Sequence, residues 1–133
     1  MMVRSGMVRS FQAGAALLFC ALSLPAAPAH AGDADVIHVD IRERTRGVYD
    51  LDVTVRSRDT GWSRYADRIE ALGPDGAVLG TRILEHPHET EQPFTRDLYD
   101  LRVPAGIARI TVRARFKPTG EAGDVLTVAL PGR

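Results

Sequence analysis

Short alternations of apolar and polar residues, separated by turn signals, dominate this chain and restrict it to a β fold. In each alternation every second residue is apolar, which is the two-residue period of a strand with one buried face. The clearest cases span residues 37–42, 49–55, 109–116 and 125–130. No stretch keeps a helical period for more than two turns, so the chain is predicted to be all-β.

Weaker extended segments fill the gaps between these strands. Residues 65–72 and 77–85 flank the turn signal Gly73-Pro-Asp-Gly76, which predicts a hairpin. A further extended segment runs from Gln92 to Val103. The result is about seven strands at intervals of roughly eight to twelve residues, the pattern of an antiparallel β-sandwich of the immunoglobulin or fibronectin type III kind.

The N-terminus has the form of a secretory signal peptide. Arg4 and Arg9 precede an apolar run from Phe11 to Leu24, and small residues and prolines follow it. Residues 1–31 are therefore expected to be removed, which leaves a single domain over residues 32–133 in the periplasm. Cleavage after Ala31 is favoured, and cleavage after Ala29 is the alternative.

Removal of this segment changes the chemistry available to the mature chain. Cys20 is the only cysteine, and it lies within the apolar run, so the mature chain has no disulfide, no thiolate ligand and no membrane span. The whole chain has 17 basic and 17 acidic residues, and the loss of Arg4 and Arg9 leaves 15 basic against 17 acidic. The resulting slight negative charge argues against nucleic acid as a partner.

Most of the mature chain resembles a set of small exported bacterial proteins of unknown function. The resemblance rests on four phrases, Trp62-Ser-Arg-Tyr-Ala-Asp67, Leu79-Gly-Thr-Arg82, Leu84-Glu-His-Pro-His88 and Glu91-Gln-Pro-Phe-Thr-Arg96. The last two form its most specific part. The resemblance implies one exported sandwich domain and no particular activity.

The His-Pro-His phrase is a candidate metal site. His86 and His88 are two residues apart, which places both imidazoles on the same side of an extended segment, and Glu89 or Glu91 could complete a ligand set. Imidazole nitrogen suits copper or zinc. The alternative is that the two histidines only hydrogen-bond to nearby backbone or to Arg96.

Two further histidines are candidates for the same chemistry. Cleavage after Ala29 would leave His30 at the new N-terminus, where its amine and imidazole form a chelate suited to Cu(II), as in small exported copper carriers. The chain lacks the second early histidine and the methionine clusters of those carriers. His38 lies on the polar face of the first strand and is expected to be exposed.

The sequence favours binding over catalysis. It contains no Gly-x-Ser-x-Gly phrase and no pairing of cysteine with histidine that would supply a nucleophile and its base. The arginines at positions 109, 113 and 115 are expected to form a cross-strand charge ladder with acidic residues. The chain is thus predicted to be a non-catalytic accessory module. Its expected partner is another periplasmic protein or a ligand, contacted by Glu91, Arg96 and Trp62.

Two large aromatic side chains are expected in the core. Trp62 and Phe94 are the expected fillers of the sandwich interior, with contact to a ligand as the alternative for each.

Overall fold

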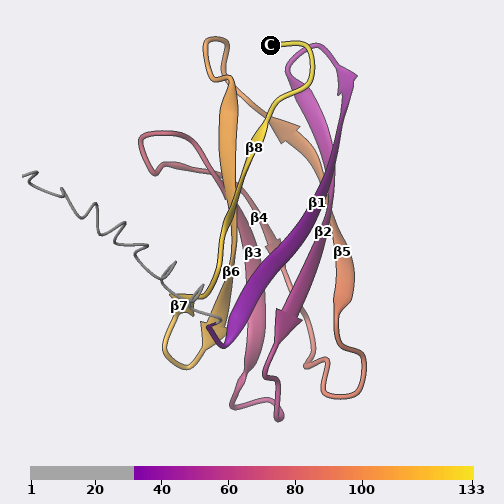
Figure 1. Ribbon diagram of the computed structural model, residues 1–133, viewed down its shortest axis with the longest axis vertical. Coiled ribbons are helices and arrows are strands. Elements are labelled where there is room, and N and C mark those ends of the chain that lie inside the picture. Colours follow the sequence, from indigo (N-terminus) through magenta and orange to yellow (C-terminus); the bar gives the residue numbers. More distant parts are fainter. Residues whose placement is uncertain (1–31) are drawn as a thin grey trace, which may run out of the picture.

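The computed structural model describes residues 32–133 and shows a β-sandwich of two antiparallel sheets. One sheet has the strand order β1-β2-β5, and the other has the order β4-β3-β6 with β7 and β8 both paired to β6 (Figure 1). The strands are β1 (Ala34–Thr45), β2 (Val48–Ser57), β3 (Tyr65–Leu72), β4 (Val78–Ile83), β5 (Phe94–Arg102), β6 (Arg109–Lys117), β7 (Glu121–Ala122) and β8 (Leu126–Ala129). The predicted sandwich is confirmed, and the predicted signal peptide lies outside the described residues.

The predicted alternation gives the two sheets their facing inner surfaces. In β2 and β6 the core apolar positions are almost fully buried, while the residues between them, apart from the buried Asp50, remain partly open to solvent. The core members from these two strands are Tyr49, Leu51, Val53, Val55, Ile110, Val112, Ala114 and Phe116. Each large apolar side chain removed from water contributes roughly 1.5–3 kcal/mol, and this burial stabilises residues 32–133, which contain no cysteine.

The two aromatic predictions have opposite outcomes. Phe94 is a core residue with 4% of its surface exposed, as expected. Trp62 was expected in the core, and that prediction is wrong, because 64% of its surface is exposed. The residue lies in the loop between β2 and β3, beyond the ends of the strands, where the alternation that buries core residues no longer operates.

The sandwich is closed along one edge by the start of β1. The amide of Val36 donates to the carbonyl of Asp124 (2.9 Å), and that of Gly123 donates to the carbonyl of Ala34 (2.8 Å). The carboxylate of Asp35, which is 5% exposed, accepts from the amides of Asp124 (2.7 Å) and Gly32 (2.8 Å). A Cβ at position 123 would lie only 2.1 Å from Asp35 Oδ1, so only glycine fits there.

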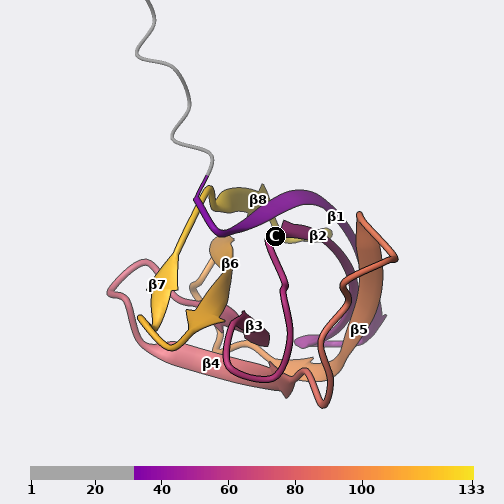
Figure 2. The same ribbon diagram turned by 90° about the horizontal axis from the view of Figure 1, so that it is seen from below.

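The opposite edge brings the outer strands of the two sheets together. In Figure 2 β4 and β5 lie next to each other there, whereas β1 and β8 are neighbours at the first edge. A Cβ at Gly80 would lie 2.6 Å from Leu101 Cδ1, so glycine allows this close approach. Arg82 and Asp97 bridge the same gap, with Nη2 and Oδ1 3.7 Å apart. The two sheets thus contact each other along both edges, and the loops lie at the two ends of the sandwich.

Candidate functional site

Two loops at one end of the sandwich form the candidate site. The loop between β2 and β3 (58–64) and the loop between β4 and β5 (84–93) both lie at the lower end of Figure 1, opposite the C-terminus. Together they carry Trp62, His86, His88, Glu89 and Glu91, which are five of the six predicted site residues. We call this region the two-loop end.

Asp59 joins the two loops. Its carboxylate is fully buried; Oδ1 accepts the amide of Ala66 (2.9 Å) and Oδ2 accepts the amide of His88 (2.8 Å). One side chain thereby fixes the start of β3 and the middle of the second loop. Hydrogen bonds to an ionised acceptor are stronger than neutral ones, at roughly 1.5–3 kcal/mol each.

Gln92 makes a second connection between the loop and the sheet. Its Oε1 accepts the amide of Ser57 (2.8 Å), while Nε2 donates to the carbonyl of His88 (2.8 Å) and to the hydroxyl of Ser57 (3.1 Å). The backbone of His88 is therefore held at its amide by Asp59 and at its carbonyl by Gln92. This geometry gives the loop one defined conformation.

The ring of His88 is packed as firmly as its backbone. It is stacked on Phe94, with the centroids 3.9 Å apart and the planes 9° from parallel, and the residue is 4% exposed. Arg96 Nη2 lies 2.8 Å from His88 Nε2. Because a guanidinium can only donate, Nε2 must be the acceptor and the ring proton must lie on Nδ1. Nδ1 faces Asp59 Oδ2 at 4.0 Å.

This environment favours the neutral imidazole. Burial lowers the pKa of His88, and the nearby charges of Arg96 and His86 lower it further, while Asp59 and Glu91 act in the opposite direction. A protonated ring could no longer accept from Arg96. His88 is therefore uncharged at neutral pH, and its tautomer is fixed by its hydrogen bond to Arg96.

The predicted metal ligands are only partly brought together. The rings of His86 and His88 do lie side by side, with centroids 4.4 Å apart. However, His88 Nε2 is occupied by Arg96, and His88 Nδ1 is buried. Over residues 32–133 no group of three or more histidine, cysteine, aspartate or glutamate side chains is placed to hold a metal ion. The set of His86, His88 and Glu89 stays a prediction, and it requires Arg96 to move.

The other predicted contact residues differ in accessibility. Trp62 stands at the tip of its loop, where the amide of Thr60 donates to the carbonyl of Arg64 and the amide of Arg64 donates to the carbonyl of Gly61. Its indole meets the Tyr65 ring edge to face at 5.8 Å and leaves most of its surface in water. Glu91 is exposed as well. Arg96 is half-buried and positions His88, so it is less available to a partner.

Asp59 and Gln92 were not identified by sequence reasoning. Asp59 is an ordinary polar residue in a polar stretch, and Gln92, although it falls within the Glu91–Arg96 phrase, has no chemistry that would single it out. Their roles depend on a contact between segments about thirty residues apart. Only the tertiary structure reveals which loops meet.

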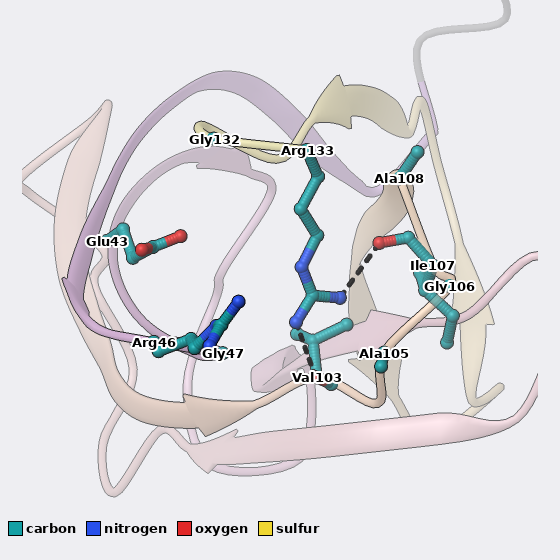
Figure 3. Close-up of a pocket in the computed structure, with 10 residues that line it drawn as sticks. All are labelled: Glu43, Arg46, Gly47, Val103, Ala105, Gly106, Ile107, Ala108, Gly132 and Arg133. Carbon is teal, nitrogen blue, oxygen red and sulfur yellow. Dashed lines mark hydrogen bonds between the residues drawn. The ribbon is translucent and has the colours of Figure 1, made fainter.

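A hollow of about 630 Å³ lies at the other end of the sandwich. Figure 3 shows the Arg133 side chain extending across it, with Arg46 and Glu43 on the opposite wall. The Arg133 guanidinium donates to the carbonyls of Val103, Pro104 and Ile107 at 2.6–2.9 Å. Since its donors are engaged by the backbone, Arg133 stabilises this end and is a weak candidate for ligand binding.

Comparison with known proteins found no family model, no curated protein and no solved structure that matches the chain. The resemblance to small exported proteins therefore stays an expectation from the sequence. In residues 32–133 there is also no helix long and apolar enough to cross a membrane.

The lowered pKa of His88 predicts that stability depends on pH through this residue. Below about pH 6.5 the unfolded chain takes up a proton that the folded state resists, so stability is complete above that pH and declines as the pH falls toward the folded pKa. Urea titrations from about pH 5 to about pH 8 give the free energy of unfolding at each pH and so measure this dependence.

A His88→Gln variant should lose the part of the pH dependence that comes from this ring, and His38→Gln on the exposed outer face should retain it. Identical pH profiles for wild type and His88→Gln would contradict this account.

Removing the ring altogether in His88→Ala should lower the free energy of unfolding by roughly 3 kcal/mol at neutral pH, because the contact with Phe94 is lost and a cavity remains.

Proposed function

We propose that this protein is an exported, non-catalytic binding module that holds its partner at the two-loop end, with Trp62 as the main contact. The observation that carries the proposal is that Trp62 is 64% exposed on a loop held in place by Asp59. Tryptophan is enriched among the residues that dominate binding energies, since a rigid aromatic side chain buries much area at a small entropic cost. A loop that is already ordered loses little further freedom on binding.

The state of His88 supports binding in preference to catalysis. The imidazole is the strongest candidate for a general base in this region, but its free electron pair accepts from Arg96. A base must reach the proton that it removes, and His88 is 4% exposed. We assign to Arg96 the role of holding His88, and to Glu91, which is exposed, a contact with the partner beside Trp62.

The strand order supports the finer classification as an immunoglobulin or fibronectin III type of sandwich. Seven-strand immunoglobulin constant-type domains place their first, second, fourth and fifth strands in one sheet and their third, sixth and seventh in the other. Strands β1-β2-β5 face β3-β6-β8 in the same way, and the difference is that β4 pairs with β3 instead of joining the first sheet.

The start of the described chain supports export with cleavage after Ala31. The nitrogen of Gly32 lies 2.8 Å from Asp35 Oδ1, and the carboxylate is nearly buried. Cleavage there would turn this amide into an ammonium group, which would pair with the carboxylate as a charge-assisted hydrogen bond. On this proposal the mature protein is periplasmic and has Gly32 as its first residue.

Binding of copper or zinc by His86 and His88 is the alternative, favoured by the 4.4 Å separation of the two rings. If the two-loop end serves as a protein or ligand contact, wild type should bind Cu(II) and Zn(II) no better than a His86→Ala/His88→Ala variant in calorimetric titration. Tight stoichiometric uptake by wild type, lost in that variant, would support the alternative.

The intact mass of the same exported preparation should give Gly32 as the first residue. A mass that gives His30 as the first residue would restore the N-terminal copper chelate.

Site-specific photo-crosslinking tests the main proposal. A photoreactive amino acid at position 62 or 91, introduced in cells that export the protein, should give an adduct of increased mass. The control is position 99. Tyr99 is also exposed, at 47%, but it lies in β5, on the outer face of the β1-β2-β5 sheet. Adducts at position 99 and none at 62 or 91 would reject the two-loop end as the binding site.

A further inference from the structure

The outer face of the second sheet carries an excess of positive charge. In β6 the buried residues alternate with Arg109, Arg113, Arg115 and Lys117, which lie on the outer face with Thr111. Arg68 of β3 is paired directly with Arg115. Among the outer-face residues that are paired across strands within residues 32–133, Glu70 is the only acidic one. Five cations therefore share one carboxylate in a chain whose mature net charge is negative.

The expected charge ladder is present only in part. Arg113 Nε donates to Glu70 Oε1 (3.2 Å), and Arg115 Nε reaches the same oxygen. Arg68 and Arg115 oppose each other in register, which is a destabilising arrangement for like charges. The Nε of Arg68 is buried and has no hydrogen-bond partner in the described part of the chain. An anion bound beside Arg68 and Arg115 would relieve the repulsion between these two cations.

Aromatic side chains adjoin this row of cations at the two-loop end. Tyr65 is paired with Lys117, whose Nζ lies 5.7 Å from the centre of the Tyr65 ring. Trp62 in turn packs against Tyr65. The exposed indole is therefore continuous with the basic face, and the two features form one surface.

This combination selects the chemistry of the partner. The face of an indole packs well against the C–H groups of a sugar ring, and guanidinium groups bind carboxylates with two parallel hydrogen bonds. A strand repeat of about 6.8 Å between alternate residues spaces the arginines for charges that recur along a polymer. Thr111 lies between Arg109 and Arg113 on this face, and Thr127 and Thr81 lie on the flanking strands β8 and β4, opposite Thr111 and Glu70.

We propose that this surface binds an acidic polysaccharide, with one sugar ring on Trp62 and carboxylates on Arg68, Arg115 and Lys117. The inference rests on the proposed binding function of the two-loop end and names its partner. Lipid is disfavoured as the partner, because the exposed large apolar side chains of β4, Val78 and Ile83, lie at opposite ends of the strand and form no continuous apolar surface.

Polygalacturonate is a suitable probe, because its methyl-esterified form has the same backbone without the charge. Trp62 is the only tryptophan of the protein, so its fluorescence reports binding directly. The exported protein should bind polygalacturonate with a change in Trp62 emission and should bind the esterified polymer at least about tenfold more weakly, with affinity for the acidic form falling as salt rises.

Variants separate this surface from general attraction of polyanions. Arg68→Gln and Lys117→Gln should each weaken binding several-fold. Trp62→Ala should weaken it about tenfold, and its binding is measured by affinity electrophoresis because the variant has no tryptophan. Arg42→Gln on the opposite sheet is the matched control and should bind like wild type. Equal losses in the Arg42→Gln control, or full binding by Trp62→Ala, would overturn the proposal.

Two further probes identify competing partners. Tighter binding to single-stranded oligonucleotides or to vesicles rich in phosphatidylglycerol than to polygalacturonate would overturn the assignment to a polysaccharide. If no acidic glycan binds while photo-crosslinks still form at position 62, the inference fails and the proposed binding function stands. If both experiments fail, the two-loop end is not a binding site.

Discussion

The buried carboxylate of Asp59 is the contact on which the candidate site depends. It ties the amide that opens β3 to an amide in the middle of the β4–β5 loop. An ionised group removed from water is costly unless its oxygens are hydrogen-bonded, and here each oxygen accepts a backbone donor. The carboxylate is therefore most stable when both loops take the observed positions, so the loops are coupled to each other and to the sandwich.

This coupling explains how a large aromatic side chain can stay in water. A flexible loop would tend to fold Trp62 back onto apolar surface, because burying an aromatic ring is favourable by a few kcal/mol. The hydrogen bonds of the Thr60–Arg64 turn and of Asp59 hold the loop away from the core. His88, Phe94 and Arg96 pack against one another beneath the second loop, so this space is already occupied by side chains. Order in the loops and exposure of the indole thus have the same cause.

Much of the fold followed from the sequence, whereas the site followed only in part. Residues 65–72 were predicted and observed as β3, because the turn Gly73–Gly76 and the two-residue period are local signals. The prediction that Trp62 is buried was wrong, since residue type alone does not distinguish a loop tip from a strand. The side-by-side placement of His86 and His88 follows from their spacing, but the occupation of His88 by Arg96 depends on tertiary packing. The shortage of acidic residues around Arg113 and Arg115 likewise depends on which strands are neighbours.

The most direct test is amide hydrogen exchange at His88, whose N–H donates to Asp59 Oδ2 at 2.8 Å. If Asp59 holds the two loops to the sandwich, this amide should exchange as slowly as amides of the central strand β2, and it should become fast in an Asp59→Ala variant that remains folded. Exchange in the wild-type protein at the rate of an unstructured peptide would show that the loops are not fixed, and it would contradict the account of the site.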